Sequence, residues 1–342
     1  MLDTLIIGAG PGGLAVANTL QNAGLQVLVL ERGPIAKSIT EYPTYMRFFS
    51  TRELLEIDGY PLTIVDEKPT RQEYLRYLTR FALDRRLPLR TYTTVLSVER
   101  QAGGHFLARA QPMGRPLEEI EAQSVVVACG GWENPVPLGV PGEDLPKVSH
   151  RFTEVHPYTG KKVLVVGGRN SAVETALLLY RAGAHVSLSY RRASFEGQGL
   201  KYWLRPDIEN RIAKGEITGH LQTTVERIDW ETVTLRGADG KAFEVENDFV
   251  IAHTGYNPPA GFLRSLGIEV EEGTNIPRHD PQTLETNVPG LFIAGTIVAG
   301  NVSGRIFIEN MRTHGENILR GLRPGALAGP AAPVLRPDVR NW

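Results

Sequence analysis

Cysteine is the scarcest informative residue in this sequence. Among 342 residues Cys129 is the single cysteine, which excludes both an internal disulfide and a redox centre built from two cysteines of one chain. An excess of charge of one sign is also missing, because 37 Lys and Arg face 38 Asp and Glu. This balance excludes the basic surface that is typical of a nucleic-acid-binding protein.

Long hydrophobic runs are missing as well, since no apolar stretch reaches the length that crosses a membrane. The first residues enter an apolar run at once, which predicts that no secretory signal peptide is present and that the protein is cytoplasmic. We therefore expect no membrane partner, no nucleic-acid partner and no metal site. With 342 residues, of which 42% are hydrophobic, the chain has room for two ordinary globular domains.

Glycine, in contrast, gathers in two segments that each lie between an expected strand and an expected helix. Residues 8–13 read Gly-Ala-Gly-Pro-Gly-Gly, and residues 167–172 read Gly-Gly-Arg-Asn-Ser-Ala. A glycine-rich turn that leads from a strand into a helix binds the phosphates of a dinucleotide at the helix N-terminus. The sequence therefore predicts an α/β protein with two Rossmann-like dinucleotide-binding domains.

The order of the expected elements predicts that the second domain is inserted into the first. Strands are expected at 4–7, 26–30, 162–166, 186–190 and 249–252, with an antiparallel meander at 95–98, 106–110 and 120–127. Helices are expected at 14–23, 70–86 and 171–182, and a strand at 290–295 and a terminal helix at 305–322 return to the first domain. We predict a first domain of residues 1–150 and 257–323, a second of 151–256, and a loose tail at 324–342.

The first glycine segment has the features of an FAD site. Gly8 permits the tight turn, Gly10 lets a pyrophosphate approach the backbone, and Gly13 lets the helix pack closely on the strand. Glu31 ends the next strand, where an acidic side chain hydrogen-bonds a ribose hydroxyl. Because a carboxylate there repels a 2′-phosphate, this domain should take FAD or NAD. The alternative is a glycine turn without a ligand.

The second glycine segment differs in two ways that favour NADPH. Arg169 stands where the middle glycine is usual, and its guanidinium can reach a phosphate. The next strand ends in Arg191 and Arg192, which suit the 2′-phosphate of NADP unless they are merely solvated charges. The segment His253-Thr254-Gly255-Tyr256 follows a returning strand and is expected on the nicotinamide side, unless it is a simple strand-to-loop turn. We therefore assign FAD to the first domain and NADPH to the second.

The end of the final strand is expected to contribute to the flavin site. Gly295 and Thr296 precede an expected helix, so their backbone N–H groups should point toward the first cofactor. A helix N-terminus beside a flavin favours the negative charge of the reduced form.

The chain resembles flavoproteins with two dinucleotide-binding domains, in particular the thioredoxin reductase group, although it lacks the Cys-x-x-Cys pair of thioredoxin reductases. It is more similar to the bacillithiol disulfide reductase family of the YpdA type, from residue 5 to about residue 319. The stretches that carry this resemblance are Tyr42-Pro43-Thr44, Phe48-Phe49-Ser50, Val140-Pro141-Gly142-Glu143, Gly167 to Glu174 and, most specifically, Ala299-Gly300-Asn301 with Ile306 to Asn310.

The resemblance implies an FAD-containing, NADPH-dependent enzyme that reduces the disulfide of bacillithiol, and a homo-oligomer. It also implies that Ser38, Phe48 and Ser50 help to line the FAD site, and that a basic residue at position 169 is usual. The chain departs from that family at Gly12, where a cysteine is typical. Cys129 is then either a substitute thiol or, as is more common for a lone cysteine, a small buried residue.

The cofactor-binding candidates fall into two sets, and no catalytic residue is predicted. For FAD they are Gly8, Gly10, Pro11, Gly12, Gly13, Glu31, Arg32, Ser38, Phe48, Ser50, Val95, Gly130, Gly295, Thr296 and Ile306. For NADPH they are Gly168, Arg169, Asn170, Ser171, Arg191, Arg192, Thr254 and Gly255. Three further residues are expected either near the flavin or in purely structural roles: Tyr42, Arg312 and His314.

The function predicted from these features is an NADPH-dependent FAD oxidoreductase that passes hydride to the flavin and on to an acceptor. The acceptor is a low-molecular-weight disulfide by resemblance, or a small redox protein such as flavodoxin or ferredoxin. Two alternatives stay open. The first is a flavin monooxygenase, which the residues His150, Phe152, His156 and Tyr158 suggest, and the second is a redox sensor that turns over slowly.

Overall fold

The computed structural model describes residues 1–132, 134–197, 199–302 and 306–325. The chain forms two compact units, Met1–Asn134 with Tyr256–Trp342, and Pro135–Gly255. The α/β class with two Rossmann-like domains is thus confirmed. The second unit begins at Pro135, whereas the sequence predicted residue 151. The difference arises because strand β8 (Val148–Ser149) pairs with β15 (Phe249–Ala252) in the sheet of the second unit.

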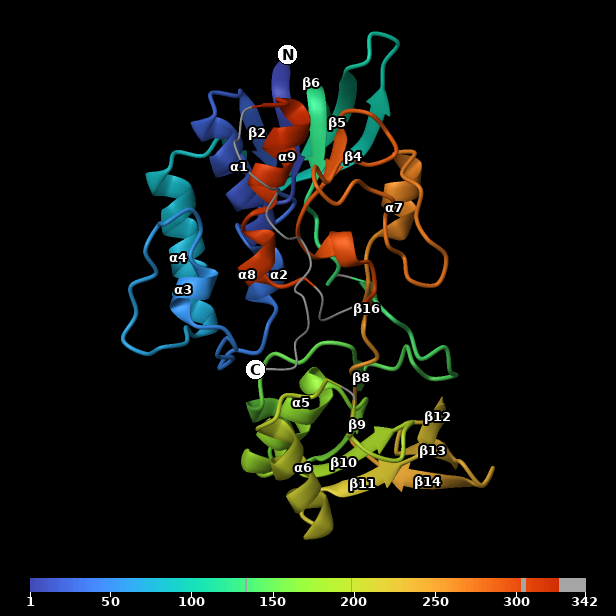
Figure 1. Ribbon diagram of the computed structural model, residues 1–342. Coiled ribbons are helices and arrows are strands. Elements are labelled where there is room, and N and C mark those ends of the chain that lie inside the picture. The colour runs from blue at the N-terminus through green and yellow to red at the C-terminus, as the bar shows by residue number, and fades with distance from the viewer. Residues whose placement is uncertain (133, 198, 303–305, 326–342) are drawn as a thin grey trace. The chain divides into compact units, whose positions relative to one another are not determined.

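The first unit is built on a seven-stranded sheet in which the expected meander continues a parallel core (Figure 1). The order is β3-β2-β1-β6-β5-β4, and β17 pairs with β6. The parallel strands are β1 (Leu2–Ile7), β2 (Val27–Leu30), β3 (Leu89–Arg90), β6 (Glu118–Val127) and β17 (Leu291–Ile293), and the antiparallel ones are β4 (Thr93–Arg100) and β5 (Phe106–Pro112). Central strand residues such as Leu5 and Val126 are fully buried, which explains their continuous apolar runs.

Helices α1 (Pro11–Asn22) and α9 (His314–Leu322) pack side by side in this unit (Figure 1). Helix α4 (Arg71–Asp84) begins at a capping box, because the Thr70 Oγ1 accepts the N–H of Glu73 at 3.2 Å and the Glu73 carboxylate accepts the N–H of Thr70 at 2.8 Å. The shorter helices are α2 (Lys37–Thr40), α3 (Arg52–Leu55), α7 (Ala260–Ser265) and α8 (Ile308–Met311). None of the helices in the described ranges is long and apolar enough to cross a bilayer.

The prediction of a single terminal helix at 305–322 is wrong, because the chain forms two helices there, α8 and α9, with a turn between them. The Thr313 hydroxyl donates to the Asn310 carbonyl at 3.0 Å and so competes with the helical ladder. The Arg312 guanidinium donates to the carbonyls of Glu53 and Glu56, at 2.7 and 2.9 Å, which fixes the turn and gives Arg312 a structural role. Residues 305 and 326–342 of the predicted helix and tail lie outside the described residues.

The second unit has a five-stranded parallel sheet and a three-stranded antiparallel one. The parallel sheet has the order β11-β10-β9-β15-β8, with β9 (Lys162–Val166), β10 (His185–Tyr190) and β11 (Thr218–Leu221). The antiparallel sheet consists of β12 (Thr223–Ile228), β13 (Thr232–Gly237) and β14 (Ala242–Glu246). The helical segments are α5 (Asn170–Arg181), α6 (Leu204–Ala213) and the 3-10 turn η1 (His156–Tyr158). Two short strands, β7 (Asn134–Pro135) and β16 (Tyr256–Asn257), lie where the chain passes from one unit to the other.

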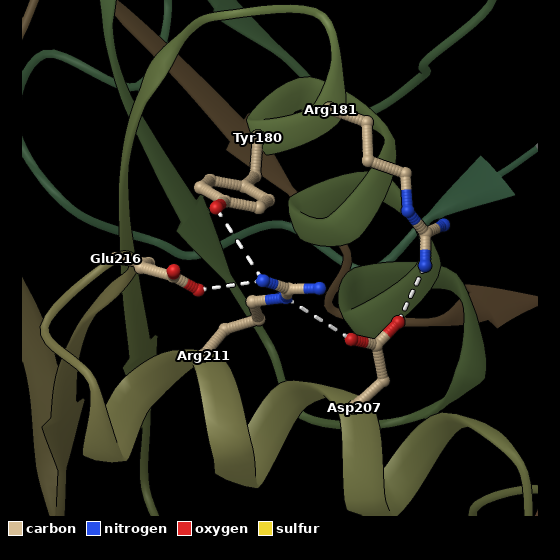
Figure 2. A network of polar contacts seen from close by, with 5 residues as sticks. All are labelled: Tyr180, Arg181, Asp207, Arg211 and Glu216. Atoms are coloured by element: carbon tan, nitrogen blue, oxygen red, sulfur yellow. Dashed lines mark hydrogen bonds and ion pairs between the residues drawn. The ribbon is translucent and has the colours of Figure 1, made fainter.

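A polar network holds α6 against the C-terminal end of α5 (Figure 2). The Arg211 guanidinium donates to Asp207 at 3.2 Å and to Glu216 at 2.7 Å, and lies 5.1 Å from the centre of the Tyr180 ring. Arg181 also pairs with Asp207. Because these contacts lie at the opposite end of α5 from the glycine segment, they position the helix without occupying the nucleotide site.

Candidate nucleotide-binding sites

The first glycine turn has two positions at which only glycine fits. Gly8 has φ +108°, and a Cβ on it would lie 2.6 Å from the Ala128 carbonyl oxygen. A Cβ on Gly13 would lie 2.0 Å from the carbonyl oxygen of Gly8. Gly10 differs, because nothing lies within 4 Å of a Cβ placed there. The turn therefore leaves open space before the N-terminus of α1, where a pyrophosphate fits.

Glu31 is buried and oriented toward this turn. One carboxylate oxygen accepts the N–H of Ala9 at 2.8 Å, and the other accepts the N–H of Gly33 at 2.9 Å. A carboxylate offers about four acceptor positions, so two are left for the hydroxyls of a ribose. The observed geometry therefore fits the adenosine end of FAD.

Gly12 lies directly against Gly295. A Cβ on Gly12 would be 3.1 Å from the Gly295 Cα and 3.3 Å from the Met311 sulfur. The predicted direction of the Gly295 N–H is wrong, because this group donates to His314 Nδ1 at 3.0 Å. The expected helix after Gly295 is only the 3-10 segment η2 (Gly295–Ala299), so its dipole is correspondingly small.

The remaining FAD candidates lie on several elements of the first unit. Thr296 lies beside Gly130, since a Cβ on Gly130 would be 3.7 Å from the Thr296 hydroxyl. Ser50 donates a hydrogen bond to the Glu309 carboxylate, and the Phe48 ring packs edge-on against Tyr74. The others are Pro11 at the start of α1, exposed Arg32 after β2, Ser38 in α2, Val95 in β4 and buried Ile306 before α8.

Two buried groups in the same unit have raised pKa values. Burial raises the pKa of the Cys129 thiol to about 12, which favours the protonated thiol over the thiolate at neutral pH, even though the residue as a whole is only partly buried. Burial likewise raises the pKa of Tyr42 to about 12, with a smaller effect of Tyr256. The Tyr42 ring packs edge-on against Trp132 at 4.5 Å, which indicates a packing role.

The second glycine turn explains why Arg169 is tolerated. Gly167 has φ +132°, with a Cβ position 2.6 Å from the His253 carbonyl oxygen, and a Cβ on Gly168 would overlap the Tyr190 ring at 2.3 Å. Arg169 caps α5 in an extended conformation, with φ −97°, which any residue adopts. The two positions that need glycine have it, and the exposed third position leaves the arginine side chain accessible.

The side chain of Asn170 holds a neighbouring loop beside the turn. It accepts the N–H of Lys201 at 2.9 Å and donates to the Gly199 carbonyl at 3.4 Å. Arg191 and Arg192 are exposed directly after β10, and Ser171 is exposed in the first turn of α5. The loop borders a hollow of about 250 Å³ that is lined by Phe195, Gly197, Gly199, Leu200, Tyr202 and Arg205.

The strand end after β15 is fixed within the second unit by its own hydrogen bonds. Thr254 donates its hydroxyl hydrogen to the Val136 carbonyl, and the Gly255 carbonyl accepts the N–H of Val136 at 2.9 Å. These contacts give Thr254 and Gly255 a structural role, and their use by a nucleotide stays a prediction.

Two titratable groups on or beside α5, His253 and Glu174, are not among the cofactor-binding residues predicted from the sequence. His253 Nε2 lies 2.8 Å from the Thr175 hydroxyl, and burial lowers the pKa of His253 to about 4, with a smaller effect of His150. Burial raises the pKa of Glu174 to about 7, opposed by the cation of Lys201. A carboxyl group that titrates near neutral pH is thus available one turn into α5, but a single acidic residue in a helical pattern gives no sequence signal of its burial.

Acidification is expected to destabilise the protein through two buried histidines. Burial lowers the pKa of His314 to about 3, with a smaller effect of His279, and that of His253 to about 4, from an ordinary value of 6.5. Both groups take up protons in the unfolded chain before they do so in the folded one. Their contribution is therefore fully present above pH 6.5, and below it falls by about 1.4 kcal/mol per pH unit for each histidine.

Urea unfolding at half-unit steps from pH 8 to pH 5 measures this dependence. Relative to the parent, the variant His253→Gln should lose the contribution of one histidine, about 1.4 kcal/mol per pH unit below pH 6.5, because glutamine does not titrate. The comparison with the parent cancels the opposing contribution of Glu174, whose raised pKa makes it stabilising as the pH falls. An identical pH dependence in the parent and the variant would contradict the neutral, buried state of His253.

Comparisons with known proteins support the interpretation of the two glycine turns as nucleotide-binding sites of an oxidoreductase. The family model described as "Pyridine nucleotide-disulphide oxidoreductase" matches residues 5–295. The chain therefore belongs to this family and is an oxidoreductase, and the predicted cofactors are confirmed as FAD and NAD(P)H.

Three similar proteins narrow the group. The "Bacilliredoxin reductase Bdr" of Bacillus subtilis is 38% identical over 92% of this chain and 95% of that protein. The solved structure "Bacillithiol Disulfide Reductase Bdr (YpdA)" from Bacillus cereus has a TM-score of 0.91 at 38% identity. The match covers 94% of this chain and 98% of that chain. A "Ferredoxin--NADP reductase" of Ignicoccus hospitalis is 25% identical over 87% of this chain and 90% of its own. The chain thus belongs with the bacillithiol disulfide reductases, which confirms the resemblance found in the sequence.

Proposed function

We propose that this oxidoreductase takes hydride from NADPH onto FAD and reduces a low-molecular-weight disulfide of the bacillithiol type. The observation that carries the proposal is the match to the Bdr relatives over nearly the full length of both chains. In the overall reaction one NADPH, one proton and one disulfide give NADP⁺ and two thiols. Bound FAD supplies the site that accepts hydride and releases two electrons, and the residues of the chain bind and orient both nucleotides.

In this proposal the first unit holds FAD. The open space at Gly10 receives the pyrophosphate, and the two remaining acceptor positions of Glu31 take the ribose hydroxyls. The carboxylate also disfavours a 2′-phosphate at this site. Gly130, Gly295 and Thr296, which lie at the carboxyl ends of β6 and β17, are assigned to the flavin side.

The second unit holds NADPH in the same proposal. The exposed guanidiniums of Arg191 and Arg192 bind the 2′-phosphate, and Arg169 at the N-terminus of α5 binds the pyrophosphate. The neighbouring hollow beside Asn170 offers room for the adenosine end.

The disulfide is reduced without a cysteine of this chain. Cys129 is the single cysteine, and its raised pKa keeps it protonated. Position 12 carries no side chain and lies against Gly295 and Met311. The substrate disulfide must therefore meet the reduced flavin directly or reach it through a thiol of a separate redox protein.

Replacement of the lone thiol tests this route. Cys129→Ala is expected to keep the rate of NADPH oxidation with the preferred acceptor within about twofold of the parent value, because alanine is a small apolar residue like a buried cysteine. Stopped-flow measurement of flavin reoxidation by the acceptor gives the rate. A loss of more than tenfold in flavin reoxidation, with flavin reduction by NADPH unchanged, would show that Cys129 takes part in electron transfer.

A second candidate acceptor is a small redox protein, which the similarity to a ferredoxin–NADP reductase favours. NADPH oxidation is measured with bacillithiol disulfide, with a thiol redox protein in its mixed-disulfide form, and with ferredoxin or flavodoxin. Fast turnover with ferredoxin and none with either disulfide would overturn the disulfide proposal. Almost no turnover with any acceptor would favour the slow redox sensor.

The residues that suggested a monooxygenase have other partners in the second unit. His150 pairs with Glu143 at 2.9 Å, and Phe152 is buried in the core around α5. The proposal therefore assigns structural roles to His150 and Phe152, and formation of an oxygenated product during NADPH oxidation would contradict it.

The cellular and quaternary assignments rest on the sequence. We propose a cytoplasmic homo-oligomer, and light scattering of the purified protein gives its mass in solution. A monomer at micromolar concentration would exclude the oligomer.

A further inference from the structure

His314 is the first residue of α9 and the most completely enclosed histidine of the first unit. Its exposed fraction is 0%, and its Nδ1 accepts the N–H of Gly295 at 3.0 Å. Since Nδ1 is the acceptor, Nε2 must carry the ring proton. That N–H is buried and has no partner among the described residues.

An unpaired buried donor costs free energy, so a histidine at this position must provide a compensating interaction. That interaction is the hydrogen bond that Nδ1 accepts from the Gly295 N–H, which an aliphatic side chain could not accept. Gly295 is the point where the chain leaves β17, with φ +80°. Its Cα lies 3.1 Å from the Cβ position of Gly12, so a small shift of this turn would close on the start of α1.

The imidazole is itself held firmly in place. The next residue, Gly315, packs against α1 so closely that a Cβ on it would be 2.4 Å from the Thr19 hydroxyl. On the following turn of α9 the Asn317 side chain donates to the Gln282 carbonyl at 2.9 Å. The packing of helix α9 therefore fixes the position of His314, and the hydrogen bond from Gly295 to His314 fixes the Gly295–Thr296 turn.

We infer that His314 is a positioning residue for FAD, whose neutral ring holds the Gly295–Thr296 turn in the conformation that receives the flavin. This inference depends on the proposed binding of FAD by the first unit. It assigns no proton or electron transfer to the imidazole. Its effect is on how tightly and in which orientation the flavin is held, since pre-formed backbone geometry lowers the cost of binding.

Two replacements separate the hydrogen bond from simple packing. His314→Leu fills the space but cannot accept the Gly295 N–H, whereas His314→Asn carries an oxygen close to the position of Nδ1. The apoproteins are titrated with FAD, the flavin absorption spectrum and midpoint potential are recorded, and the unfolding temperature is measured separately. We expect His314→Leu to bind FAD about tenfold more weakly or worse, with a shifted spectrum, and His314→Asn to stay within about threefold of the parent.

His220→Leu, in the second unit, is the matched control, because His220 also has a buried Nε2 for which the described part of the chain offers no partner. It should leave FAD affinity and the flavin spectrum unchanged, and its unfolding temperature is measured in the same way. If His314→Leu does not fold, His314→Met replaces it as the variant without an acceptor.

Equal FAD affinity and spectrum in the parent and the variant without the acceptor, or equal loss in the Asn and Leu variants, would overturn the inference. A parent protein that binds no FAD would instead overturn the proposed function.

Discussion

Simultaneous replacement of Arg191 and Arg192 by alanine is expected to weaken NADPH binding about a hundredfold while NADH binding changes by no more than about twofold. The two guanidiniums are exposed at the end of β10. Each charge-assisted hydrogen bond to a phosphate contributes about 1.5 kcal/mol or more, so two of them give about 3 kcal/mol. NADH lacks the 2′-phosphate, so its binding free energy does not include these hydrogen bonds and should not change.

Binding of both nucleotides and of 2′,5′-ADP to the FAD-loaded protein measures the selectivity directly. Arg227→Ala is a suitable control, because Arg227 is an exposed arginine on β12 that pairs with Asp229. It should leave both affinities unchanged. Equal losses for NADPH and NADH, or no loss for either, would contradict the assignment of the 2′-phosphate site to this pair.

Gly10→Val is expected to abolish FAD binding without harming the fold, a loss of affinity of about a hundredfold or more. Gly10 has φ −73° and ψ 176°, which is extended backbone that valine adopts readily. Nothing lies within 4 Å of its Cβ position. The new side chain would therefore occupy the space that the pyrophosphate needs. Unfolding of the apoprotein should stay within about 1 kcal/mol of the parent.

Gly13→Ala is expected to lower the affinity for FAD by a similar factor, but for a different reason, because it disturbs the turn itself. A Cβ there would lie 2.0 Å from the Gly8 carbonyl oxygen, so the turn itself must shift. Overpacking of this kind costs about 1–3 kcal/mol or more, and the apoprotein should unfold earlier. Gly261→Ala, in α7 with open space at its Cβ position, is the control and should bind FAD normally. Tight FAD binding by Gly10→Val would remove the first turn from the flavin site.

Local sequence was sufficient to predict the two glycine turns to which nucleotide binding is assigned. The glycines at positions 8, 13 and 167 were predicted because strand, turn and helix follow one another without a break, and each position has the close contact that excludes a side chain. The acidic residue at position 31 was likewise found from its distance to the turn. The terminal helix failed because Arg312 bonds to carbonyls more than 250 residues away in sequence, which no local pattern contains.

The sequence by itself determined the two dinucleotide folds, the lack of a cysteine pair and the balance of charge, because short-range steric rules and composition fix these features. Only the tertiary structure decided where the Gly295 N–H points, why Arg169 is tolerated, and that burial raises the pKa of the Cys129 thiol. Each of these depends on atoms from distant segments that fill the space around one group. Burial and hydrogen-bond partners, which set the pKa of a side chain and the orientation of a backbone N–H, are properties of that packing and not of the residue type.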